Sequence, residues 1–135
     1  DAASMAAMIR RWKTTDRSTP SPEGHWAITL SPHGSVIGGT TLARVPTPDG
    51  SVTLHAELSR SAWGHGFAAE AGDALIHWAM HEAAVLNVFA LVPPGHVRGA
   101  STAERMGMQW IYDLGNGLRV YRIRHGDLAC PDPVA

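Results

Sequence analysis

The chain has 135 residues, enough for one domain with a hydrophobic core. Its 11 Lys and Arg against 12 Asp and Glu give a formal net charge of −1, which argues against a nucleic-acid or membrane-surface partner. A single cysteine, Cys130, excludes an internal disulfide and favours a reducing, cytoplasmic compartment, and no apolar run approaches the roughly 20 residues of a membrane span.

The N-terminal third predicts one helix and then two strands. Residues 2–13 carry an apolar stripe at helical spacing, which predicts an amphipathic helix; the stripe consists of Met5, Met8, Ile9 and Trp12. After a polar, proline-containing segment, residues 25–30 and 35–45 predict two strands joined by the turn SPHG.

The middle third predicts a strand followed by a helix. The turn TPDG leads into residues 51–58, whose alternation predicts a strand with one apolar and one polar face. Residues 67–84 then predict an amphipathic helix with an apolar stripe made by Phe67, Ala71, Ala74, Leu75 and Trp78. We interpret three tryptophans as core residues, namely Trp26, Trp78 and Trp110.

The C-terminal third completes the expected domain. Residues 88–92 predict a strand buried on both faces, and residues 97–106 a short helix that Gly107 ends. Residues 108–114 and 118–124, joined by GNG, predict a hairpin, and residues 126–135 a loose tail. The chain is therefore expected to form one α+β domain over residues 1–135, with a mixed sheet.

The turn between strand 51–58 and helix 67–84 holds two glycines one residue apart, Gly64 and Gly66. The first N–H groups of a helix lack partners, and the helix macrodipole is positive there. Glycines let an anion approach the backbone closely. The pattern indicates either a plain tight turn or a site for a phosphate group that needs no Lys or Arg.

The segment SAWGHGFAAEAGDALIHWA, residues 61–79, resembles the acetyl-CoA signature of the GNAT N-acetyltransferase superfamily, especially its branch of ribosomal-protein alanine acetyltransferases. A second family block is matched at the expected distance by HVRGASTAERMGM, residues 96–108. The resemblance covers roughly residues 5–124. It implies a mixed, mostly antiparallel central sheet flanked by helices. The family's first strand and first helix have no counterpart before Asp1, so we expect a missing N-terminus or a sheet with one strand fewer.

The resemblance implies acetyl-CoA as co-substrate, a primary amine as acceptor, direct acetyl transfer and no metal. Backbone N–H groups of residues 64–68 would hold the cofactor's diphosphate, with Trp63 packing beneath the turn. The implied cofactor-binding residues are Leu58, Ser59, Trp63, Gly64, His65, Gly66, Phe67, Ala68, His96 and Arg105. A backbone N–H where strand 51–58 splays from strand 88–92 would polarise the thioester carbonyl.

Three side chains are candidates for proton transfer. Glu57 lies on the polar face of its strand and could accept the proton of the amine. His55, on the same face, is the alternative because an imidazole titrates near neutral pH, although both could be ordinary solvent-facing residues. Ser101 is the candidate hydroxyl acid, because Ala103 stands where many members of the family carry a tyrosine.

The sequence departs from the family at three further positions. Ser61 stands where a Gln or Arg is frequent, and His96 and Gly99 replace an Asn and a Ser. His96 would either donate to the pantetheine arm in place of that Asn or be a loop residue. The changes favour an alternative function, a catalytically weak acyl-CoA-binding module of the same fold.

Two features outside the resemblance complete the set of expectations. His77 and His81 lie one helical turn apart, a spacing that could hold zinc, but without a third ligand we interpret them as the wet face of the helix. Acceptor sites in this superfamily are often completed by a second subunit, so the resemblance also allows a homodimer.

Overall fold

The computed structural model describes residues 7–11, 23–30, 34–45 and 50–128. Its strands are β1 (Ala7–Arg11), β2 (Gly24–Leu30), β3 (Ser35–Arg44), β4 (Val52–Leu58), β5 (Asn87–Val92), β6 (Gln109–Asp113) and β7 (Arg119–Arg124). The α-helices of this part are α1 (Phe67–Glu82) and α2 (Val97–Arg105), and single 3-10 turns form η2 (Arg60–Ala62) and η3 (His125–Asp127).

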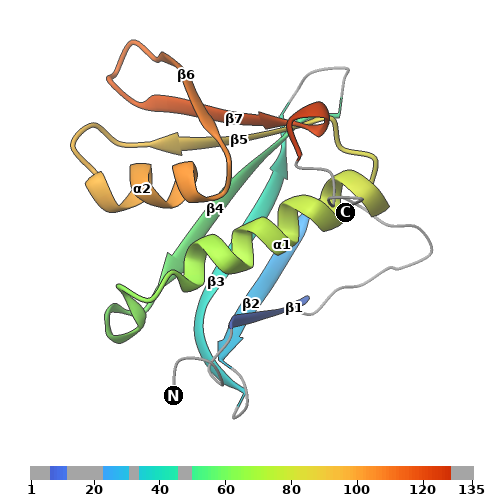
Figure 1. The fold of residues 1–135 in the computed structure, drawn as a ribbon, viewed down its shortest axis with the longest axis vertical. Coiled ribbons are helices and arrows are strands. Elements are labelled where there is room, and N and C mark those ends of the chain that lie inside the picture. Colours follow the sequence, from blue (N-terminus) through green and yellow to red (C-terminus); the bar gives the residue numbers. More distant parts are fainter. Residues whose placement is uncertain (1–6, 12–22, 31–33, 46–49, 129–135) are drawn as a thin grey trace, which may run out of the picture.

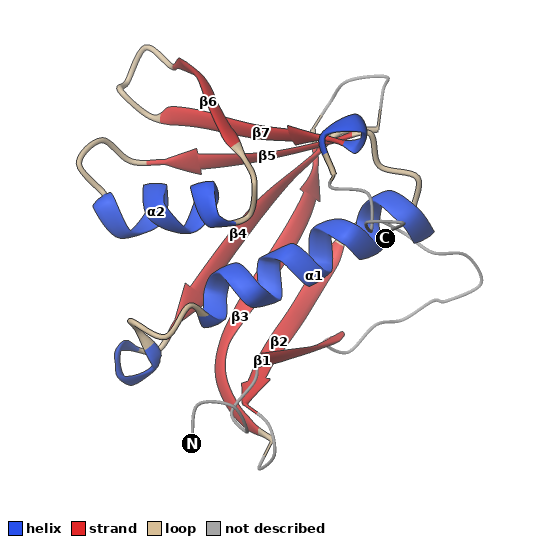
Figure 2. Ribbon diagram, in the orientation of Figure 1, coloured by secondary structure: helices blue, strands red, loops and turns tan. Residues whose placement is uncertain are grey.

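The described strands form one seven-stranded sheet in the order β1-β2-β3-β4-β5-β7-β6 (Figures 1 and 2). Neighbouring strands are antiparallel except β4 and β5, which are parallel. The α+β class, the mixed sheet, the two hairpins and both helices after residue 66 are thus confirmed. Of the predicted turns SPHG and TPDG, only Gly34 and Gly50 lie within the described residues.

The helix predicted over residues 2–13 is wrong for residues 7–11, which form strand β1; the rest of that range lies outside the described residues. β1 pairs antiparallel with β2, from Ala7 opposite Leu30 to Arg11 opposite Trp26. A helix of about 12 residues is marginal on its own in water, whereas the edge of β2 offers a row of backbone partners. Tertiary pairing therefore overrides the helical spacing, and the sheet has an edge strand that the sequence did not predict.

Both helices pack on the same face of the sheet, as Figure 1 shows, and the main core lies beneath them. Trp26 is 5% exposed and packs edge-on against Trp78, so its assignment to the core is confirmed. Ala74 of the predicted stripe is exposed, because the buried face of α1 is centred on Leu75, Ile76 and Ala79.

Trp110 is 50% exposed, so its assignment to the core is wrong. It lies on β6, the last strand of the sheet, where packing against a neighbour is available on one side only. Its indole Nε1 donates to Asp113 Oδ1 at 2.7 Å, and the Arg119 guanidinium lies 4.0 Å from the ring centroid.

The prediction that β5 is buried on both faces is also wrong. Val88 and Val92 point into the core, but Leu91 on the other face is 46% exposed. Within the described residues no helix covers that second face (Figure 2). The molecule therefore has two layers in this part, and no described helix covers one face of the sheet.

The start of the predicted tail is anchored rather than loose. The Arg124 guanidinium pairs with the Asp127 carboxylate at 3.1 Å, which lowers the pKa of Asp127 from its ordinary value through the hydrogen bond. Leu128 packs against the core, and residues 129–135 lie outside the described residues. In the described part, neither helix has the length and apolar character that a membrane crossing requires.

Gly38 lets β3 approach β4 closely. A Cβ at Gly38 would overlap the carbonyl oxygen of Glu57, a backbone atom that cannot rotate away. At the next residue, Gly39, an added Cβ would lie 3.6 Å from the Trp26 carbonyl oxygen, an ordinary contact. Gly38 therefore fixes the position of the strand segment that carries Glu57.

We expect Gly38→Ala to lower the free energy of unfolding by about 2 kcal/mol or more, because overpacking against backbone forces β4 to move. The matched variant Gly39→Ala is expected to change it by less than about 1 kcal/mol. Urea unfolding of the two variants and the wild type measures both values. Equal effects at the two positions would contradict the proposed close approach.

Candidate active site

The central feature of the site is the divergence of β4 from β5. The two strands pair at only two positions, Val52 with Val88 and Thr53 with Phe89. Beyond these positions β4 stays paired with β3, and β5 with β7. The sheet therefore opens into a slot between β4 and β5, which Figure 1 shows widening toward α2.

A cleft of about 520 Å³ occupies this slot. Residues of both sheet faces line it, because the slot runs through the sheet: Leu54 and Ala90 from the helix side, His55 and Leu91 from the open side. α1 contributes Ala68 and Gly72, and α2 contributes Arg98, Gly99, Thr102 and Ala103. A ligand inside the cleft is thus accessible from the open face of the sheet.

The β4 wall of the slot offers backbone hydrogen-bonding groups. Ser59 donates its N–H to the Ile37 carbonyl of β3, and Val45, just after β3, donates its N–H to the Ser51 carbonyl. Because the direction of backbone groups alternates along an antiparallel strand, those of Ala56 and Leu58 point away from β3, toward the slot. The slot therefore presents N–H donors at the edge of β4, as an unpaired strand does.

The glycine turn lies at the end of this wall. Gly64 and Gly66 have φ values of 86° and 76°, a left-handed conformation that strongly favours glycine. Gly66 is the N-cap of α1; its carbonyl accepts from the Glu70 N–H at 3.0 Å, and no side-chain cap bond forms. The N–H groups of the first turn of α1 are therefore available to an anion.

Trp63, expected to pack beneath the turn, lies in the wall of the cleft and is 37% exposed. Its indole Nε1 donates to the Leu58 carbonyl at 3.1 Å, which fixes the ring beside β4. Arg105, from the last turn of α2, reaches the glycine turn: its Nη1 lies 3.0 Å from the position of a Cβ on Gly66.

The structure brings most of the predicted site residues together. Those that line the cleft are His55, Glu57, Leu58, Trp63, Ala68 and His96. Those that lie in the turn or against it are Ser59, Gly64, His65, Gly66, Phe67 and Arg105. The Phe67 side chain is buried in a small core with Ile28 and Ala62, so only its backbone is available to a ligand.

Ser101 is not brought to the site. It is exposed and does not line the cleft, whereas its neighbour Thr102 does. Thr102 was not predicted, since Ser101 was the one hydroxyl of this segment considered as a replacement for the missing tyrosine. Helix periodicity carries the missing signal, since Thr102 lies three residues after Gly99 on the same face of α2.

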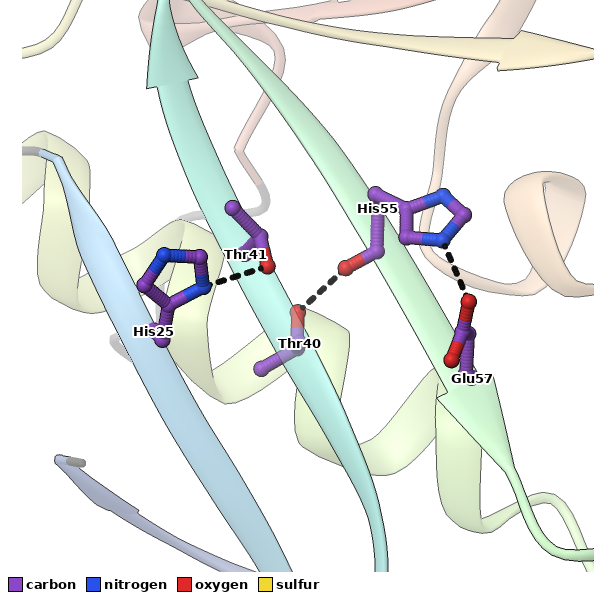
Figure 3. A network of polar contacts seen from close by, with 5 residues as sticks. All are labelled: His25, Thr40, Thr41, His55 and Glu57. Atoms are coloured by element: carbon purple, nitrogen blue, oxygen red, sulfur yellow. Dashed lines mark hydrogen bonds and ion pairs between the residues drawn. The ribbon is translucent and has the colours of Figure 1, made fainter.

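A second hollow, of about 300 Å³, shares His55 and Glu57 with the cleft. Figure 3 shows the His55 imidazole and the Glu57 carboxylate of β4 turned toward each other, with Nε2 and Oε2 at 3.2 Å. Their side chains are 70% and 79% exposed. Next to them, His25 Nδ1 lies 3.0 Å from the Thr41 hydroxyl, also in the lining of the hollow.

His96 is the N-cap of α2, and this role explains why residue 99 is a glycine where the family has a serine. Its Nδ1 accepts the Gly99 N–H at 2.7 Å, which leaves the proton of a neutral imidazole on Nε2 as a donor. A Cβ at Gly99 would come within 2.5 Å of that Nδ1. The histidine and the glycine are therefore coupled: the imidazole cap leaves no room for a side chain at residue 99.

His77 and His81 lie on the outer face of α1. Nδ1 of His77 is 2.8 Å from the Asp73 carbonyl, and Nδ1 of His81 is 2.9 Å from the His77 carbonyl. Across the described ranges, no group of three or more His, Cys, Asp or Glu side chains is arranged to hold a metal ion.

The matching family model is the acetyltransferase (GNAT) domain, over residues 1–109. Because this match covers most of the chain, the protein belongs to the GNAT acetyltransferase domain family. The slot, the glycine turn and the helix that follows agree with the resemblance found in the sequence.

Solved structures of this fold include a GNAT-family acetyltransferase from Bacillus anthracis (15% identity, TM-score 0.70, 76% of this chain). An acetyltransferase from Agrobacterium tumefaciens matches at 28% identity and TM-score 0.66 over 76% of this chain. Mycobacterium smegmatis RimJ in complex with CoA-disulfide matches at 15% identity and TM-score 0.69 over 78% of this chain. The chain spans 66%, 61% and 54% of these three solved chains. No curated protein matches it by sequence.

The coupling between His96 and Gly99 can be measured. His96→Ala is expected to cost about 1 kcal/mol of unfolding free energy through the lost cap. Gly99→Ala is expected to cost about 1 kcal/mol less in the His96→Ala background than in the wild type, because no imidazole is displaced there. A double-mutant cycle in urea tests this, and additive effects would contradict the coupling.

Proposed function

We propose that this chain binds acetyl-CoA in the slot between β4 and β5 and transfers its acetyl group to a primary amine. The observation that carries the proposal is the course of the slot. It begins at the uncapped N-terminus of α1, follows the free edge of β4, and opens beside Glu57 onto a second hollow.

The parts of the cofactor fit this course in order. The diphosphate would bind the N–H groups of residues 64–68, where the helix dipole favours an anion and Arg105 adds a positive charge. The pantetheine arm carries two amides, which can pair with the free edge of β4 as a neighbouring strand would. His96 Nε2–H is a further donor in the lining.

The transfer itself forms one N–C bond and breaks one C–S bond. A neutral amine attacks the thioester carbon, the carbonyl oxygen gains negative charge, and a backbone N–H such as that of Ala56 stabilises this charge. The tetrahedral intermediate collapses with departure of the coenzyme A thiolate. The proton lost by the amine goes to a base, and the thiolate takes up a proton from a hydroxyl or from water.

Glu57 is the proposed base and His55 its partner. Both line the cleft and the second hollow, so an amine that enters from the open face passes them before it reaches the thioester. We assign the hydroxyl available to the thiolate to Thr102 in place of Ser101, because Thr102 lines the cleft. Much of the rate would come from the positioning of the two substrates.

An acyl-CoA-binding module is the second candidate function. The observation in its favour is Ala103, which is 2% exposed and stands where many family members carry a tyrosine. Such a module would bind coenzyme A but would release no thiol with any of a panel of amines, including amino acids, peptides and polyamines. Release of thiol above the rate without amine contradicts the module.

Binding is tested through the glycine turn. Gly66→Ala is expected to weaken coenzyme A binding at least tenfold, because the left-handed turn that presents the N–H groups is disfavoured for alanine. Gly34→Ala is the matched control, since Gly34 has φ 73° and open space around it in another turn. Isothermal titration calorimetry compares the two variants, and equal affinities would contradict the diphosphate assignment.

Glu57→Gln is expected to lower kcat about 100-fold while the affinity for acetyl-CoA changes less than about threefold, because the amide cannot accept the proton. His55→Gln is the matched variant and is expected to lower kcat by less than tenfold. Thiol release at saturating acetyl-CoA measures both. A larger loss in His55→Gln would transfer the role of the base to His55.

A further inference from the structure

A group of arginines surrounds Trp63 at the mouth of the cleft. The Arg98 guanidinium of α2 lies 4.0 Å from the ring centroid of Trp63, and that of Arg60 in η2 lies 5.4 Å from it. Arg98 and Trp63 both line the cleft. Two cations from distant parts of the chain therefore meet at the ring of Trp63, the residue that directly precedes Gly64 of the glycine turn.

These cations have no acidic partner among the described residues. In that part of the chain, the arginines with an ion pair are Arg44 and Arg124, and neither lines the cleft. Arg60 and Arg98 at Trp63, and Arg105 at Gly66, thus bring three positive charges without an ion pair to one region, in a chain whose formal net charge is −1. An anion that binds among such charges is attracted by all of them.

The charges exceed what a diphosphate at the helix terminus requires. The N–H groups of α1 and the nearby Arg105 already serve that group. Arg60 and Arg98 lie instead beside the aromatic ring of Trp63, the residue before Gly64. A ligand that continues from the diphosphate into a nucleobase and a further phosphate would use both the aromatic ring and the two arginines. The 3′-phosphorylated adenosine of coenzyme A has this chemistry.

We propose that Arg60 and Arg98 bind the 3′-phosphate of coenzyme A beside Trp63, and that they make the chain select coenzyme A over dephospho-coenzyme A. The inference rests on the proposed function, because it assumes that the diphosphate binds at the glycine turn. The residues that select the nucleotide are thus separate from those that handle the acetyl group.

The site is held in place before the ligand arrives. Trp63 is fixed to the Leu58 carbonyl through its Nε1, and Arg98 stacks on the exposed part of its ring. Stacking leaves the planar edge of a guanidinium free for two hydrogen bonds to phosphate oxygens. Because less side-chain freedom is lost on binding, such a prepared arginine contributes more affinity than a mobile one.

The test compares the affinities of coenzyme A and dephospho-coenzyme A by isothermal titration calorimetry. We expect the wild type to bind coenzyme A at least tenfold more tightly at low salt, with the preference shrinking as salt screens the exposed charges. Arg98→Gln and Arg60→Gln are each expected to weaken coenzyme A severalfold and to leave dephospho-coenzyme A unchanged. The double variant should abolish the preference.

Arg119→Gln is the matched control. The guanidinium of Arg119, on β7, also lies 4.0 Å from the centroid of a tryptophan ring, that of Trp110 on β6, but neither residue lines the cleft. It is expected to keep the full preference for coenzyme A.

Equal binding of the two ligands by the wild type overturns the inference and leaves the proposed function standing. Equal losses for both ligands in Arg98→Gln also overturn it, since the arginine would then serve the diphosphate or the fold. If the wild type binds neither ligand, the proposed function fails, and the inference with it.

Discussion

The structure depends on one constraint, the two-residue pairing between β4 and β5. Strands that continued side by side would satisfy each other's backbone groups and leave a closed sheet. Here β4 stays paired with β3, and β5 with β7. The edges of β4 and β5 that face each other therefore retain N–H and C=O groups without strand partners. Such edges need water or a ligand with amide-like groups. The slot is therefore a consequence of sheet topology, and Ala68 in the first turn of the helix that follows β4 lines it.

Three departures from the family pattern, at Ser61, His96 and Gly99, can be understood from the contacts around them. His96 caps α2 with its ring, and this cap is compatible with glycine and not with a larger residue at position 99. Ser61 supplies no charge at the glycine turn, but Arg105 reaches that turn from α2, and Arg60 and Arg98 lie on either side of it in sequence. Arg98 and Arg105 thus bring to this region charge from α2, which a motif read along the chain does not reveal.

The sequence predicted the elements whose signals are local. The alternation in residues 51–58, the stripe in α1 and the glycine turn all depend on neighbours in the chain. The failures involve partners distant in sequence. Residues 7–11 follow the edge of β2, Leu91 is exposed on the face that no described helix covers, and Trp110 is exposed on the edge strand β6. Thr102, and not the predicted Ser101, lines the cleft, because Thr102 lies on the face of α2 that carries Gly99. The slot was expected from the resemblance, but which backbone groups face it follows only from strand register.

In the proposed function, the two-layer arrangement would separate the two substrates. The cofactor would lie in the cleft between β4 and β5 and the acceptor in the second hollow, with His55 and Glu57 bordering both. Because these two side chains are 70% and 79% exposed, water screens their interaction in the free protein. An acceptor that fills the hollow would displace this water and strengthen that interaction. The shape of the acceptor would then influence the rate as well as the affinity.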